Sequence, residues 1–220
     1  MKGARSLRRR GVAGRVRARW ASTYETSAYR DLPWFAEGPA PPVERAVADG
    51  FLRPAAPVLD VGCGAGSNVL FLARKRFRAF GVDLAPGAVR AAKARAAAAG
   101  LTVDVREGDA LVLDFADATF GGVVDIGCFH TLPIGRRGDY AREIARVLRP
   151  GGALLLSWVA RESSGEFGPP HRPSLREVTD ALEGEFLFTR TDYHGAGEDR
   201  RLATYDARLL RRTTPQPPRR

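Results

Sequence analysis

The chain has 220 residues, which is enough for one domain with a substantial hydrophobic core and excludes a tiny disulfide-stapled fold. Hydrophobic residues make up 44% and charged residues 27%, as in an ordinary globular protein, and the formal net charge is +10. That charge lies in the tails, because residues 1–20 hold eight Lys or Arg, residues 211–220 hold four Arg, and neither segment holds an acid. The body, residues 21–210, has a net charge of −2, so the charge gives little support for a nucleic-acid or membrane partner.

Composition divides the chain into four segments. Residues 1–20 are basic and poor in apolar side chains, so we expect a disordered N-terminal extension there. Residues 21–55 combine aromatic side chains with a proline-rich turn, which predicts a small helical cap. Residues 56–210 form the main domain, and residues 211–220 are expected to be a flexible tail.

The main domain alternates apolar runs with amphipathic stretches, in chain order. Strands are predicted at 58–62, 79–84, 102–109, 121–127, 151–158, 186–193 and 203–210, and helices at 67–76, 86–99, 137–149 and 174–182. Such alternation predicts an α/β fold with a mostly parallel, doubly wound sheet that has helices on both faces. The last two strands are about ten residues apart, which is too short for a helical crossover, so we expect an antiparallel pair.

A glycine-rich turn follows the first predicted strand, in the sequence VLDVGCGAGSN at 58–68. Gly62, Gly64 and Gly66 permit a sharp turn and let a ligand lie against the backbone, although a turn without a ligand is the simpler alternative. The spacing differs from the GxGxxG pattern of dinucleotide-binding folds because the third glycine comes one position early. Asp60 precedes this turn and would repel a pyrophosphate, so a cationic ligand such as S-adenosylmethionine suits the site better.

Two further acids follow predicted strands. Asp83 ends the second strand, where its carboxylate can accept hydrogen bonds from ribose hydroxyls; a helix N-cap is the alternative. Asp109 ends the third strand, where it can hold an adenine edge or act as an ordinary loop cap.

Four segments in this order, VLDVGCGAGSN, GVDLAP, REGDAL and LRPGGALLLS, resemble the signature of the class I S-adenosylmethionine-dependent methyltransferases. The resemblance implies a Rossmann-like, seven-stranded sheet of order 3-2-1-4-5-7-6 with strand 7 antiparallel. It also implies S-adenosyl-L-methionine as cofactor and S-adenosyl-L-homocysteine as product. By the resemblance, Asp60, Gly62 and Gly64 bind the methionine part, Asp83 the ribose, and Asp109 and Ala110 the adenine. Cys63, Leu84 and Asp125 are further candidate cofactor-binding residues.

A looser resemblance concerns DIGCFHTLP at 125–133 and DLPW at 31–34, which are similar to segments of thiopurine S-methyltransferases and tellurite-resistance methyltransferases. The [DN]PP[YF] motif of methyltransferases that modify base amino groups is absent after the fourth strand. Both observations favour a small-molecule acceptor.

The acceptor side is expected between the end of the fourth strand and the cap. His130 is the candidate general base and Asp125 a candidate for orienting the donor, with a loop cap and a packed carboxylate as the respective alternatives. The candidate walls of the acceptor site are Tyr24, Trp34, Phe35 and Phe129, for which core packing is the alternative. Three His and two Cys, scattered singly, predict no metal site.

Cys63 and Cys128 are too few for a disulfide framework, and neither a secretory signal nor a membrane-spanning stretch is visible, so we expect a cytoplasmic protein. The leading hypothesis is a methyltransferase that acts on S, O or N of a small molecule, as a monomer or homodimer without a nucleic-acid or membrane partner. One rival is an RNA- or protein-directed methyltransferase that docks through residues 1–20. Another is a non-catalytic S-adenosylmethionine-binding protein.

Overall fold

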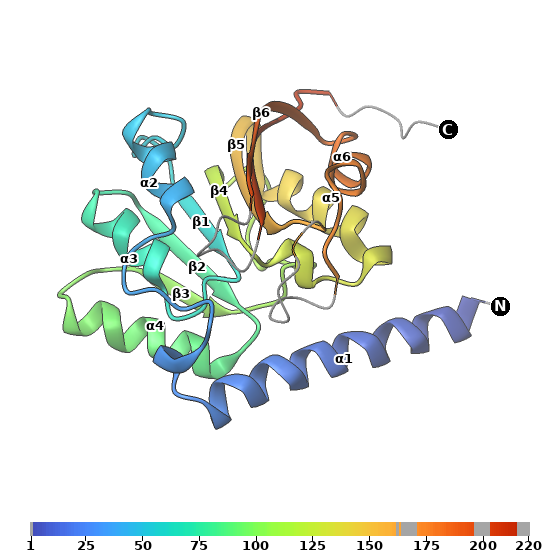
Figure 1. The fold of residues 1–220 in the computed structure, drawn as a ribbon, viewed down its shortest axis with the longest axis horizontal. Coiled ribbons are helices and arrows are strands. Elements are labelled where there is room, and N and C mark those ends of the chain that lie inside the picture. Colours follow the sequence, from blue (N-terminus) through green and yellow to red (C-terminus); the bar gives the residue numbers. More distant parts are fainter. Residues whose placement is uncertain (1, 162, 164–170, 196–202, 215–220) are drawn as a thin grey trace.

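The computed structural model describes residues 2–161, 163, 171–195 and 203–214, with only the backbone described for residues 2–13. Its centre is one seven-stranded sheet, drawn in Figure 1, with the order β3-β2-β1-β4-β5-β7-β6. The strands are β1 (Val58–Val61), β2 (Ala79–Asp83), β3 (Asp104–Glu107), β4 (Phe120–Ile126), β5 (Leu148–Val159), β6 (Phe186–His194) and β7 (Thr204–Arg211).

The predicted topology is confirmed. Strands β1 to β5 are parallel to one another, and β7 is antiparallel to both β5 and β6. The parallel strands therefore end at one edge of the sheet, which is where ligands bind in doubly wound folds. Strand β3 is shorter than predicted because Asp109 instead makes an isolated bridge with Val112 in the following turn.

Helices cover both faces of the sheet. They are α1 (Lys2–Thr26), α2 (Pro41–Ala48), α3 (Ser67–Arg74), α4 (Pro86–Ala98), α5 (Arg137–Val147) and α6 (Leu175–Leu182), with short 3-10 turns η1 (Tyr29–Asp31), η2 (Phe129–Thr131) and η3 (Ile134–Arg136). Buried residues of α2, α3 and α4, such as Val43 and Val69, form one core cluster, while α5 and α6 contribute Tyr140 and Val178 to the other. Each face of the sheet thus has its own apolar core.

The N-terminal segment differs from the prediction, because residues expected to be disordered belong to helix α1. The segment is rich in Ala and Arg, which have high helix propensity, and its later part gains tertiary contacts. Trp20 packs edge-to-face against Trp34, and Arg17 pairs with Glu107. Figure 1 shows the N-terminal end of α1 extending beyond the body of the molecule. The predicted tail at 211–220 lies mostly outside the described residues.

No helix among the described residues is long and apolar enough to cross a membrane.

Candidate functional site

The glycine turn links β1 to α3 at the carboxyl edge of the sheet. Gly62, Gly64 and Gly66 have φ of +69°, +55° and +84°, a region that other residues rarely adopt. A Cβ on Gly62 would lie 2.7 Å from the Cβ of Cys128, so the loop also passes closely over the end of β4. The backbone conformation therefore favours glycine at all three positions, and at Gly62 there is also no space for a side chain.

Asp60 lies beneath this turn and is fully buried. Neither of its carboxylate oxygens has a hydrogen-bond partner, in the part of the chain that the structure describes. Burial is the main cause that raises the pKa of Asp60 well above its usual value. Nearby Asp125 and Asp83 raise it further, and the nearby side-chain amide of Asn68 lowers it. An unpartnered buried carboxylate calls for a donor or a cation from a ligand.

Asp83 connects the glycine turn to the next strand-helix junction. Its Oδ2 accepts a 2.9 Å hydrogen bond from the backbone N–H of Gly64, and its Oδ1 accepts one of 2.8 Å from Ala85, the N-cap residue of α4. Burial raises the pKa of Asp83, although these hydrogen bonds lower it. The contact with Ala85 at the start of α4 corresponds to the capping alternative. Each carboxylate oxygen can still accept a second hydrogen bond, from a ligand hydroxyl.

These residues fit the cofactor that the resemblance implies. Asp125 and Asp83 both act on Asp60 electrostatically, so the strand ends bring three carboxyl groups, and the negative charge of their ionised forms, next to the glycine turn. The ammonium and sulfonium groups of S-adenosylmethionine would offset that charge, whereas a pyrophosphate would add to it. Asp60 with Gly62 and Gly64 would hold the methionine part and Asp83 the ribose.

The remaining predicted cofactor residues are close to this edge. Oδ1 of Asp109 accepts a hydrogen bond from the backbone N–H of Leu111, as in the loop-cap alternative, and Ala110 is buried beside it. Leu84 is half-buried directly after β2. Cys63 is buried, with its sulfur facing Gly81, and burial raises the pKa of its thiol well above the usual value. Their roles toward the cofactor stay predictions.

Asp125 supports the loop that follows β4. Its oxygens accept hydrogen bonds from the backbone N–H groups of Cys128 and Phe129 and from the Tyr140 hydroxyl, the last at 2.6 Å. Burial raises the pKa of Asp125 to about 6, although these hydrogen bonds lower it. The contacts correspond to the packed-carboxylate alternative and fix η2 against α5.

His130 is buried in η2. Its Nδ1 accepts a 3.1 Å hydrogen bond from the backbone N–H of Val159 at the end of β5, so the neutral ring carries its proton on Nε2. Burial and the nearby charge of Arg137 lower the pKa of His130 to about 4. At neutral pH neither ring nitrogen is a free base, and the geometry corresponds to the loop-orienting alternative.

The predicted acceptor walls separate into three environments. Phe129 is fully buried and packs edge-to-face on Tyr140, so it belongs to the core. Phe35 packs against Tyr29 and under the guanidinium of Arg95, on the flank of α4. Trp34 is 53% exposed.

Tyr24 and Trp34 lie at the glycine turn. The Trp34 indole N–H donates to the Tyr24 hydroxyl at 3.3 Å, and a Cβ on Gly64 would lie 3.0 Å from that hydroxyl. Burial raises the pKa of Tyr24 to about 12, with Asp83 and Cys63 adding to the effect and the Trp34 hydrogen bond lowering it. The cap therefore places one phenol and one open indole beside the cofactor residues.

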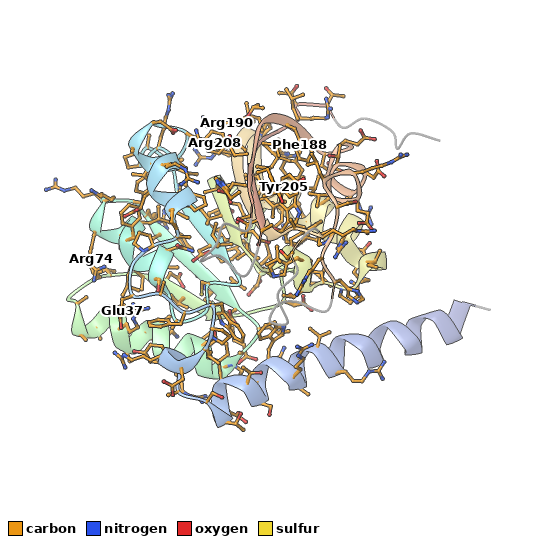
Figure 2. The ribbon with its side chains drawn as sticks, in the orientation of Figure 1. Glu37, Arg74, Phe188, Arg190, Tyr205 and Arg208 are labelled. Carbon is orange, nitrogen blue, oxygen red and sulfur yellow. The ribbon has the colours of Figure 1, made fainter. Side chains whose placement is uncertain are left out.

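The structure adds two arginines that the sequence analysis missed. Arg95 donates from Nη1 to the backbone oxygen of Ala65 in the glycine turn and from Nη2 to Glu37, which Figure 2 labels beside α4. Arg137 is the first residue of α5 and is buried. Arg95 is three residues from the buried Ala92 in α4, and Arg137 is three residues from the buried Tyr140 in α5. A charged residue on the apolar face of a helix is the sequence signal that could have identified both.

Comparisons with known proteins identify the family. Residues 58–152 match a family model described as a methyltransferase domain. Over 185 residues the chain is 33% identical to the 2-heptyl-1-hydroxyquinolin-4(1H)-one methyltransferase of Mycobacteroides abscessus, covering 79% of this chain and 80% of that protein.

Solved structures share the fold. The 1,6-didemethyltoxoflavin-N1-methyltransferase of Burkholderia thailandensis, with bound 1,6-didemethyltoxoflavin and S-adenosylhomocysteine, superposes with a TM-score of 0.73 and 22% identity, covering 92% of this chain and 90% of that one. A structure from work on the conversion of a disulfide bond into a thioacetal group in echinomycin biosynthesis has a TM-score of 0.72 and 25% identity, covering 82% and 86%.

The chain belongs to the class I S-adenosylmethionine-dependent methyltransferases. It is an enzyme that transfers the methyl group of S-adenosylmethionine to a small-molecule acceptor.

Proposed function

We propose that the acceptor is a small planar heteroaromatic molecule that is methylated on an ionisable oxygen or nitrogen. The observation that carries this proposal is the cap, where Tyr24 lies against the glycine turn and its hydroxyl accepts from Trp34, which in turn packs on Trp20. Flat aromatic side chains beside the methyl donor favour a flat partner through stacking. The named activities of the quinolone and toxoflavin enzymes concern acceptors of this kind.

The cofactor supplies an electrophilic methyl group bound to a sulfonium sulfur. Asp60, Asp83 and the glycine turn bind and orient it, and the cap residues exclude water and align the acceptor for displacement. His130 and Asp125 act as positioning residues, because their hydrogen bonds hold η2 against β5 and α5. A general base is not required when the acceptor arrives ionised.

Asp109 and Ala110 would face the adenine, and Cys63 and Leu84 would contact the remaining parts of the cofactor. We also propose that the enzyme works in the cytoplasm as a monomer or homodimer. Both cysteines are free, and burial raises the pKa of both thiols. These observations support a protein that works without disulfide bonds.

A methylation assay with labelled S-adenosylmethionine tests the acceptor class. The panel contains hydroxyquinolones, phenols, thiols, amines and chalcogen oxyanions. We expect labelled product from hydroxyquinolones or related heteroaromatics. Preferential labelling of aliphatic thiols or oxyanions would overturn the proposal.

Two variants locate the acceptor. Trp34→Ala should raise the KM for the heteroaromatic acceptor while S-adenosylhomocysteine binding is retained. Leu187→Ala, an equally exposed apolar residue on β6, is the matched control and should change neither quantity. Equal effects of the two substitutions would contradict the role of the cap.

A further inference from the structure

Arg137 is a buried arginine in which two of the three guanidinium nitrogens lack a hydrogen-bond partner among the described residues. The residue is 3% exposed, and its Nε and Nη2 make no hydrogen bond in the described part of the chain. Its guanidinium lies over the ring of Phe129, 5.3 Å from the centroid. A cation-π contact contributes only about 0.5–2 kcal/mol, well below the several kcal/mol that burying an ion costs.

Among the described residues, no carboxylate forms an ion pair with this guanidinium. Glu177 is the acid that acts on Arg137 electrostatically, but its Oε2 already accepts from the Ser174 backbone and hydroxyl and from Arg161. Asp139, in the first turn of α5, pairs with Arg136 and Arg142 instead. Oε2 of Glu177 and both oxygens of Asp139 are therefore occupied by other residues.

The two unpartnered nitrogens have a defined geometry. Nε and Nη2 form the side edge of the planar guanidinium, where two parallel N–H groups match the two oxygens of a carboxylate. Both nitrogens of this edge are buried and make no hydrogen bond to a described residue, whereas buried polar groups of side chains are normally hydrogen-bonded.

Arg137 also lies near the catalytic edge of the sheet. Its guanidinium covers Phe129, whose backbone N–H is held by Asp125, and its charge acts on His130. The neighbouring Cys128 approaches Gly62 in the cofactor turn. A ligand group on Arg137 would thus belong to a molecule bound beside the methyl donor.

We propose that Arg137 binds an anionic oxygen group of the methyl acceptor, such as a carboxylate or an ionised hydroxyl beside a carbonyl. This inference rests on the proposed function and deepens it, because it assigns the enzyme an acidic acceptor. Arg137 then acts as a substrate-binding and specificity-determining residue.

Calorimetric binding of two isosteric probes in the presence of S-adenosylhomocysteine tests this assignment. The probes are 4-hydroxyquinoline-2-carboxylate and its neutral 2-carboxamide. We expect the intact enzyme to bind the carboxylate at least tenfold more tightly than the amide. Arg137→Gln should weaken carboxylate binding at least tenfold and leave amide binding unchanged, and Arg137→Lys should recover part of the loss.

Arg136→Gln is the matched control, because it removes the neighbouring charge, which pairs with Asp139. It should preserve the preference for the carboxylate. Equal binding of both probes by the intact enzyme, a change below twofold in Arg137→Gln, or the same loss in Arg136→Gln would overturn the assignment.

Stability measurements separate binding from folding. Because two nitrogens of Arg137 lack a hydrogen-bond partner in the part of the chain that the structure describes, Arg137→Met should unfold at the same or a higher temperature and bind S-adenosylhomocysteine normally. A lower unfolding temperature would show that Arg137 forms a structural ion pair and would overturn the proposal. Failure of the methylation screen in the intact enzyme would count against the proposed function, whereas methylation of neutral acceptors with no carboxylate preference would overturn only this inference.

Discussion

The backbone N–H of Gly64 donates a 2.9 Å hydrogen bond to Oδ2 of Asp83, which ties the glycine turn to the end of β2. The same carboxylate accepts from Ala85 at the start of α4. One side chain therefore fixes two strand-helix junctions at the cofactor edge, and its remaining lone pairs can still accept hydrogen bonds from a ribose.

Asp83→Asn should weaken binding of S-adenosylhomocysteine by about 10- to 100-fold. The amide cannot accept on both sides, so a backbone N–H or a ribose hydroxyl is left unpaired at a cost of about 1–3 kcal/mol. Calorimetric titration measures the affinity. Asp104→Asn on the neighbouring β3, which pairs with Arg106 at the surface, is the control and should bind normally. An unchanged affinity in Asp83→Asn would contradict the proposed contact between Asp83 and the ribose.

Gly62→Ala should destabilise the protein more than Gly100→Ala does. Both glycines have positive φ, +69° and +62°, which costs an alanine about 1–2 kcal/mol. Only at Gly62 would the new Cβ meet a neighbour, Cys128, and overpacking adds about 1–3 kcal/mol. Urea unfolding measures both free energies. Adding Cys128→Gly to Gly62→Ala should recover the steric part, and equal losses in the two single variants would contradict the close approach.

The sequence predicted the sheet well because each strand carries its own apolar run and each junction its own glycine or acid. The burial of individual side chains was harder to predict. Phe129 and Trp34 are both aromatic residues near the site, yet Phe129 packs on Tyr140 in the core and Trp34 is exposed, a difference that arises from tertiary contacts. The partner of His130 is Val159, 29 residues away, so only the tertiary fold reveals that its Nδ1 is occupied.

Binding of S-adenosylmethionine should release protons from the enzyme. Burial raises the pKa of Asp60, so part of the free enzyme carries the protonated acid at a pH above its usual range, and a cationic ligand favours the ionised form. Affinity should therefore increase as pH rises toward the pKa of the free enzyme and then level off. Calorimetry in two buffers of different ionisation enthalpy measures the release. S-adenosylhomocysteine, which lacks the sulfonium charge, should release fewer protons, and Asp60→Asn should abolish the difference.

His130 should contribute to stability only when it is neutral. Its folded pKa of about 4 lies below the unfolded value of about 6.5, so the unfolded chain binds the proton first and stability rises with pH across that window, by up to about 3 kcal/mol. In His130→Asn the amide oxygen can still accept from Val159, so stability at pH 7 should be kept while this pH dependence disappears. His130→Ala should lose about 1–3 kcal/mol at pH 7. Unfolding at several pH values tests both, and an identical pH dependence in His130→Asn would contradict the buried neutral ring.

Deleting residues 1–20 should preserve methyl transfer to a small acceptor. The deletion removes the basic part of α1 but keeps Tyr24, so the cofactor residues remain covered. Loss of the Trp20 contact to Trp34 should raise the acceptor KM a few fold, and Trp20→Ala alone should reproduce that change. Turnover measured at 50 and 200 mM salt should change little in either form, because a small acceptor, unlike a polyanion, has no condensed layer of counterions to release. A steep salt dependence that disappears with the deletion would instead support a polyanionic acceptor docked on the arm.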